Sequence, residues 1–115
     1  MATEEDVRRF LNELKLKVAV YGIIYEDHEG KNAQTLLDLE ITSIQRKKYI
    51  QSLTYKDYSE GPLKESYYGG GEMWVFGLDI KRKLVYIKIT LGRPKLDVIC
   101  ISFHIAEHKM QFPFK

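Results

Sequence analysis

Three residues in the second half of the chain have side-chain types and spacing that could do chemistry. Tyr86 and Lys88 lie in the apolar run 85–90, and His104 follows a second apolar run, 98–103. Both runs are rich in β-branched residues, which is typical of strands, and alternate residues of a strand point to one face. Counting by twos therefore predicts that Tyr86, Lys88 and His104 share one face of a small sheet.

These side-chain types fit the cleavage of RNA without a metal ion. In that reaction the substrate's own 2′-hydroxyl attacks phosphorus, so the enzyme must move protons and stabilise a charged transition state. A histidine can act as acid or base near neutral pH, and lysine or arginine stabilises phosphate charge. We therefore expect His104 to be the general acid or base, Lys88 and Arg93 to contact the phosphate, and Tyr86 to position the substrate.

The segment from Thr54 to Glu72 and the turn 92–95 provide further candidates for binding RNA. The first is rich in Tyr, Gly, Ser and Lys and contains Gly61-Pro62, which predicts a long loop, and long loops in compact domains are often functional. Tyrosine rings can stack on unpaired bases. The predicted RNA contacts are Tyr58, Tyr67, Tyr68 and Lys95, with Tyr55 as a further stacking candidate.

Metal, phosphate-loop and thiol chemistry are disfavoured. The residues His104 to His108 match the H-x-x-E-H pattern of one zinc protease class, but that pattern needs a helix, and here the first histidine ends a predicted strand. The three glycines 69–71 lack the Lys-Ser/Thr that follows a phosphate loop. Cys100 lies mid-strand and is expected to be a small packed side chain. We expect no metal and no cofactor.

Length and composition indicate one domain, residues 1–115, without a membrane span. A single cysteine excludes an internal disulfide, and the acidic N-terminus lacks an apolar signal core, so we expect a cytoplasmic protein. Residues 1–60 hold 9 Lys/Arg and 11 Asp/Glu, whereas residues 61–115 hold 9 and 5. The halves therefore carry −2 and +4, and the basic half is the one that can attract phosphates.

The first half of the chain predicts the helices. Thr3 and Asp6 resemble a capping box that starts a helix over residues 4–15. Residues 17–25 are predicted to form a strand, residues 27–30 a turn, and residues 32–39 a short helix. Thr42 can cap a further helix over residues 43–52 that buries Ile44 and Ile50.

The second half predicts a sheet with one apolar face. That face is expected to hold Trp74, Phe76, Leu78, Ile80, Val85, Ile87, Ile89, Leu91, Ile99, Ile101 and Phe103. The opposite face is expected to hold Val75, Gly77, Asp79, Tyr86, Lys88, Thr90, Cys100, Ser102 and His104. The predicted fold class is α+β, with two or three helices packed on one face of a twisted antiparallel sheet.

Over residues 36–104 the chain resembles the MqsR-type toxins of bacterial type II toxin–antitoxin systems, as a divergent branch. The resemblance includes residues 39–42, Leu53, residues 57–58, Trp74, the string 85–90 and residues 98–103. It implies a RelE-like fold and a messenger-RNA endoribonuclease, held inactive by a cognate antitoxin that covers the polar sheet face or adds a strand to an edge. It leaves association with the ribosome open.

The same resemblance keeps a second hypothesis open. Tyr86 falls on a tyrosine that the family is thought to use, and His104 falls where a family lysine sits. However, Ser59-Glu60 stands in place of a family Tyr-Lys pair, and Val75 in place of a glutamine. These differences favour the alternative, a non-catalytic RNA- or protein-binding module with the same fold.

Overall fold

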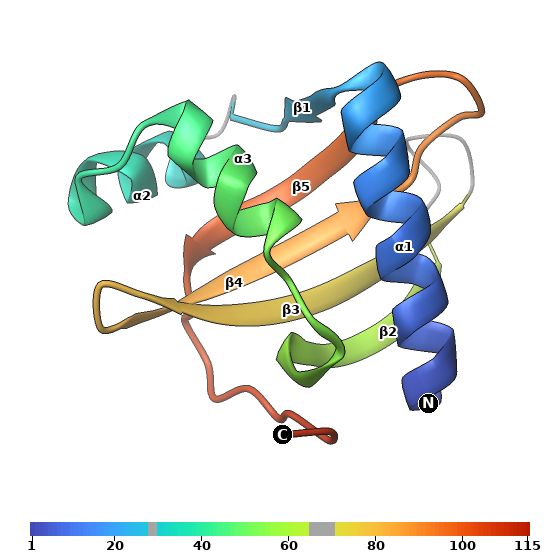
Figure 1. The fold of residues 1–115 in the computed structure, drawn as a ribbon. Coiled ribbons are helices and arrows are strands. Elements are labelled where there is room, and N and C mark those ends of the chain that lie inside the picture. The colour runs from blue at the N-terminus through green and yellow to red at the C-terminus, as the bar shows by residue number, and fades with distance from the viewer. Residues whose placement is uncertain (28–29, 65–70) are drawn as a thin grey trace.

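The computed structural model describes residues 1–27, 30–64 and 71–115, and has an α+β fold. The helices are α1 (Glu4–Tyr21), α2 (Lys31–Leu39) and α3 (Ser43–Gln51), with a short 3-10 turn, η1 (Tyr55–Asp57). The strands are β1 (Ile23–Tyr25), β2 (Tyr58–Lys64), β3 (Glu72–Ile80), β4 (Lys83–Thr90) and β5 (Val98–Ile105). Figure 1 shows α1 and α3 crossing in front of the sheet, with the C-terminal segment below it.

One five-stranded sheet has the order β1-β5-β4-β3-β2. The pairs β2–β3, β3–β4 and β4–β5 are antiparallel, whereas β1 pairs parallel with β5. The expectation of a purely antiparallel sheet is therefore wrong at β1, and the sheet is mixed. The reason is topological, because α1 delivers the chain to the outer edge of β5 in the same direction as β5.

Helix α1 starts as expected but is longer. Thr3 and Asp6 form the predicted capping box, and the buried residues Val7, Phe10, Leu11, Leu14 and Val18 follow at helical spacing. The predicted strand over residues 17–25 is wrong for residues 17–21, because Val18 continues the buried stripe of the helix. Gly22, with φ of 90°, ends the helix, and only Ile23–Tyr25 remain as a strand.

The two later helices are confirmed, with one error in what they bury. Thr42 and Gln45 form a capping box at the start of α3, and Ile50 is buried. Ile44, which was expected in the core, is 71% exposed, and the helix instead buries Arg46. In α2 the buried face contains the polar residue Asn32.

The predicted loop over residues 54–72 is wrong for the part that the structure describes. It contains η1 and the strand β2, which pairs with β3. The register shifts twice along this pairing, so the side chains of β2 do not alternate between faces in the regular way that reveals a strand. Strand β2 lies at the edge of the sheet, where Pro62 is tolerated because one side of the strand is unpaired.

The helix-covered face of the sheet contains the core. Phe76, Ile87 and Phe103 lie side by side across β3, β4 and β5, and all three are fully buried. A bulge between Lys88 and Ile89 then shifts the pairing of β4 with β5 by one residue.

Because of the bulge, part of β5 points to the face of the sheet opposite to the one predicted. Ile89 pairs with Cys100, and Thr90 pairs with Ile99. Cys100 therefore belongs to the core, and the assignment of Ile99 and Ile101 to the apolar face is wrong. Period-2 counting placed them there because it assumes a strand without a bulge.

Candidate functional site

Tyr86 and His104 face each other on the sheet face opposite the helices. They are directly paired across β4 and β5, and their rings stack with centroids 5.2 Å apart and an interplanar angle of 15°. The next pair on this face is Lys88 with Ser102, and Lys88 Nζ lies 5.8 Å from the Tyr86 ring centroid. The structure thus brings together the three side chains that the sequence predicted to share a face.

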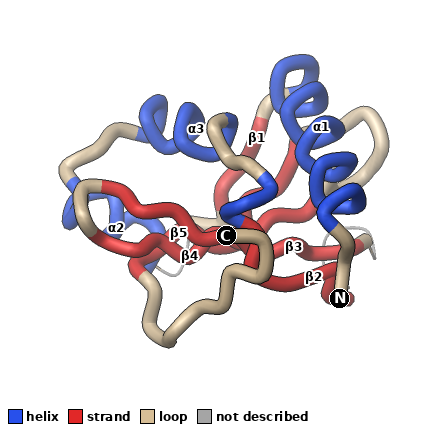
Figure 2. The backbone as a smooth tube through the Cα atoms, turned by 60° about the horizontal axis from the view of Figure 1, so that its bottom comes forward, coloured by secondary structure: helices blue, strands red, loops and turns tan. Residues whose placement is uncertain are grey.

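These residues line a cavity of about 570 Å³, which we call the sheet-face cavity. Its floor is formed by β4 and β5, one wall by β2, and the other by the C-terminal tail, residues 106–115, which Figure 2 shows running below the sheet. The lining residues are Ser59, Glu60, Tyr86, Lys88, Ser102, His104, Glu107, His108, Lys109, Met110 and Gln111. This volume lies within the range of about 300–1,000 Å³ that is common for ligand sites.

A glycine in β3 allows the tail to lie against the sheet. Gly77 pairs with Tyr86, so it is on the face of the sheet-face cavity. A Cβ atom at this position would lie 2.6 Å from Phe112 Cζ and 3.1 Å from Met110 Cε. The absence of a side chain at Gly77 is therefore what lets Met110 and Phe112 approach the strand.

A hydrogen bond indicates which ring nitrogen of His104 carries a proton. Its Nδ1 lies 3.0 Å from the carbonyl oxygen of Ile105. A carbonyl oxygen can only accept, so Nδ1 carries the proton and donates. In the neutral ring the lone pair is then on Nε2, which is the form of a general base.

Tyr86 is a neutral hydrogen-bonding group at physiological pH. Burial raises the pKa of its phenol, and the nearby negative charge of Glu60 raises it further. The hydroxyl therefore keeps its proton and can donate to a phosphate oxygen.

Glu107 connects the tail to α2 and lies near both histidines of the site. Its carboxylate is 2.9 Å from Lys31 Nζ, and this hydrogen bond and charge lower the pKa of Glu107. His104 and His108 lower the pKa of Glu107 by smaller amounts, which places both imidazoles within electrostatic reach of this carboxylate.

Arg93 and Lys95 are not part of this cluster. Both lie in the connection between β4 and β5, which folds back toward α1, where Lys17 Nζ donates to the carbonyl oxygens of Leu91 and Arg93. Lys95 lines a groove together with Leu16 and other residues of α1. Neither residue lines the sheet-face cavity, so the structure does not bring them together with Tyr86, Lys88 and His104.

Tyr58 cannot stack on a base. Its side chain is fully buried between Trp74, Phe76 and Phe114, and its hydroxyl donates to the carbonyl of Gly61. Its predicted role in RNA binding is therefore wrong, because its pairing with Phe76 turns it into the core. Tyr55 is half-buried under Arg8, whose Cζ lies 4.0 Å from the ring centroid. Tyr67 and Tyr68 lie outside the described residues.

The sequence predictions missed six polar residues of the site, Ser59, Glu60, Glu107, His108, Lys109 and Gln111. All six lie on β2 or the tail, the two segments whose positions were not foreseen. Gly77 lies between residues with large apolar side chains, Phe76 and Leu78. A glycine at such a position in a strand is the local sign that another segment approaches there.

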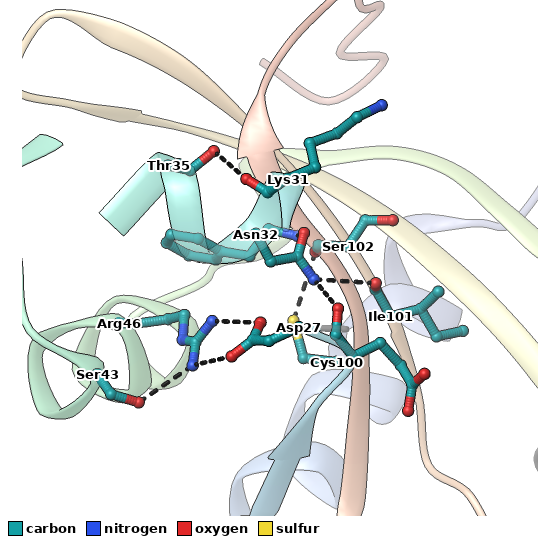
Figure 3. Close-up of polar contacts among 11 residues, drawn as sticks. Asp27, Lys31, Asn32, Thr35, Ser43, Arg46, Cys100, Ile101 and Ser102 are labelled. Atoms are coloured by element: carbon teal, nitrogen blue, oxygen red, sulfur yellow. Dashed lines mark hydrogen bonds and ion pairs between the residues drawn. The ribbon is translucent and has the colours of Figure 1, made fainter. Parts of the chain in front are cut away.

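A buried polar cluster supports the outer edge of β5 near the site (Figure 3). Arg46, 2% exposed, makes two bonds to the Asp27 carboxylate, of 3.1 and 3.2 Å, and lies 3.4 Å from the centre of the Tyr25 ring. Asn32 bonds the backbone of Ile101 and Phe103. These contacts fix the strand that presents Ser102 and His104.

Within residues 1–27, 30–64 and 71–115, no group of three or more His, Cys, Asp or Glu side chains is arranged to hold a metal ion. His104 lies in β5 and His108 in the tail, so the H-x-x-E-H pattern is not on a helix. Burial raises the pKa of the Cys100 thiol to about 12, which keeps it protonated and unreactive.

Comparison of the chain with protein-family models, with curated proteins and with solved structures found no match. In the described part of the chain, no helix has the length and apolar character needed to cross a membrane.

Proposed function

We propose that this protein is an endoribonuclease that cleaves messenger RNA without a metal ion. The observation that carries the proposal is the stacked Tyr86–His104 pair, with Lys88 beside it, in a cavity of about 570 Å³. His104 takes the proton of the 2′-hydroxyl, Lys88 balances the charge of the phosphate, and Tyr86 donates to a phosphate oxygen. The products are a 2′,3′-cyclic phosphate and a 5′-hydroxyl end.

We further propose that the protein is a type II toxin of the MqsR type with a RelE-like fold, acting in the cytoplasm. The resemblance in sequence supports this proposal, together with an α+β fold in which one sheet face presents the cavity. A cognate antitoxin that covers this face would block the cavity.

A specific observation favours a second candidate function, a non-catalytic RNA- or protein-binding module. Glu60 lines the sheet-face cavity and acts on Tyr86 through its charge. A carboxylate at this position repels phosphate. This repulsion weighs against RNA in either role, so the observation favours the protein-binding form of the module, which would bind a partner through Lys88 and Lys109 without cleavage.

A cleavage assay separates the two candidates. The wild-type protein is incubated with end-labelled messenger RNA in the presence of a chelator, and the new ends are tested for a 2′,3′-cyclic phosphate. We expect cleavage by the wild type and a loss of roughly 10²-fold or more in His104→Ala, because a positioned acid or base contributes about that much. Binding of intact RNA by the wild type would instead favour the module.

A matched pair of lysine variants on β4 tests the phosphate contact. Lys88 lines the cavity, whereas Lys83 lies at the exposed start of the same strand and does not. We expect Lys88→Ala to weaken cleavage and its salt dependence, and Lys83→Ala to retain both. Equal losses in the two variants would mean that general positive charge, and not this site, attracts the RNA.

A further inference from the structure

The sheet-face cavity contains a second histidine that the roles assigned above do not use. His108 lies in the tail and lines the same cavity as His104. His104 reaches the cavity from its floor, since it belongs to β5, and His108 reaches it from the wall formed by the tail, which runs below the sheet. Both lie within electrostatic reach of Glu107.

Cleavage by the 2′-hydroxyl needs two proton transfers at opposite ends of the reacting phosphorus. One group removes the proton of the attacking hydroxyl, and another protonates the leaving 5′-oxygen. The hydrogen bond from His104 Nδ1 to the carbonyl of Ile105 leaves Nε2 as the ring nitrogen that can exchange a proton with the substrate, and the function proposed above assigns it the role of base. The acid must therefore come from elsewhere in the cavity.

Among the other side chains of the cavity, an imidazole is the best chemical match for the acid. Carboxyl groups are ordinarily ionised at neutral pH and have no proton to give, and an ordinary lysine ammonium is a weak acid. An imidazolium gives up its proton readily at neutral pH. His108 supplies an imidazole to this cavity.

We propose that His108 is the general acid of the reaction, paired with His104 as the general base; this rests on the function proposed above. As the bond between the 2′-oxygen and phosphorus forms, the proton of the 2′-hydroxyl passes to His104 Nε2. As the bond between phosphorus and the 5′-oxygen breaks, that oxygen takes a proton from His108. His104 ends protonated and His108 neutral, and exchange with water restores both.

The test uses a leaving group that needs no acid. Two oligonucleotides are prepared around a cleavage site mapped with the wild type, one natural and one with sulfur in place of the bridging 5′-oxygen. A thiolate leaves without protonation, so loss of the acid no longer slows the reaction. We expect His108→Ala to cut natural RNA roughly 10²-fold more slowly, and the sulfur substrate at nearly the wild-type rate.

His104→Ala is the matched comparison, because loss of the base slows both substrates. The pH profile gives a second readout. The wild-type rate should fall on both the acidic and the basic side, and the fall on the basic side should disappear in His108→Ala. Far-UV circular dichroism and the urea midpoint should match the wild type, since His108 is exposed.

Three results would overturn the assignment. Natural RNA cut by His108→Ala at the wild-type rate would remove His108 from the reaction. Equal losses on both substrates would show that it acts in binding or structure instead of protonation. No cleavage by the wild type would overturn the proposed function itself, and with it this inference.

Discussion

Replacing Asn32 by alanine should destabilise the protein and loosen the strand that carries His104. Strand β1 ends at Tyr25, opposite Cys100, and among the described residues no strand pairs with the outer edge of β5 beyond that point. The Asn32 side chain bonds the edge of β5 where a neighbouring strand would otherwise pair (Figure 3). Its Nδ2 donates to the Ile101 carbonyl at 3.3 Å, and its Oδ1 accepts from the Phe103 N–H at 2.9 Å. Nδ2 also donates to the Glu26 carbonyl at 2.6 Å.

The magnitude follows from what alanine leaves behind. Asn32 is only 5% exposed, so the groups that it satisfies are poorly reached by water. The Phe103 N–H left without an acceptor costs about 1–3 kcal/mol, and each lost bond to a carbonyl about 0.5–1.5 kcal/mol. Since water can partly fill the vacated space, we expect a loss of about 3 kcal/mol in the free energy of unfolding.

Urea unfolding measures this loss directly. For a small protein with a slope of about 1.5 kcal/mol/M, a loss of about 3 kcal/mol lowers the midpoint by about 2 M. Amide hydrogen exchange gives a local readout, because the Phe103 amide should exchange faster in Asn32→Ala than in the wild type.

The matched control is another amide on the same helix. Gln34 is exposed, and its side-chain amide donates to the exposed carboxylate of Asp38 in the same helix at 3.0 Å. Gln34→Ala should therefore change the free energy of unfolding by less than about 0.5 kcal/mol. A similarly small change in Asn32→Ala, with unaltered exchange at Phe103, would refute the idea that this amide stands in for a strand.

Three further predictions concern the caps, the tail and the buried ionisable groups. Thr42→Ala removes the capping box with Gln45 and should lower the free energy of unfolding by about 1 kcal/mol in urea; an unchanged midpoint would contradict it. Gly77→Val should displace Phe112 and speed trypsin cleavage after Lys109. The control is Gly71→Ala, whose added Cβ would lie 3.7 Å from Thr90 Oγ1 and which should leave the rate of trypsin cleavage unchanged. Equal cleavage rates in the two variants would contradict the packing of Phe112 against Gly77. Burial raises the pKa of Cys100 and of Tyr25 to about 12, from 9.0 and 10.0, so the native state keeps protons that the unfolded chain loses. The free energy of unfolding should thus be undiminished below about pH 9 and fall toward pH 12. The fall should be less steep in Cys100→Ala. A urea midpoint that rises between pH 9 and pH 12 would contradict the burial of these two protonated groups.

The parts of the fold that could be predicted are those with local signals. The capping boxes at Thr3 and Thr42 depend on residues three positions apart, so they identify where α1 and α3 begin. The end of α1 was misjudged because Val18 and Val20 are β-branched and favour a strand, whereas burial of Val18 against the sheet keeps the helix going. A contact across the molecule overrides a local preference there, and only the fold reveals it.

The polar face was predicted correctly for some residues and wrongly for others because of one bulge. Tyr86, Lys88, Ser102 and His104 all lie on the same side of the shift between Lys88 and Ile89, where β4 and β5 pair in a regular register. Counting by twos is valid within that stretch. It fails for Ile99 and Cys100 because a single unpaired residue exchanges the faces beyond it.

The cavity itself could not be predicted, because its walls come from segments without periodicity. The tail carries no run of strand or helix character, yet Phe112 packs at Gly77, and Phe114 contacts Tyr58 with ring centroids 5.6 Å apart. These two aromatic contacts hold the tail along the cavity, which His108 lines together with the strand residue His104. A flat sheet face with one histidine could bind a phosphate, but a face flanked by the tail offers a second group that can transfer a proton. The chemistry proposed for this protein therefore depends on the packing of the tail as much as on the strands beneath it.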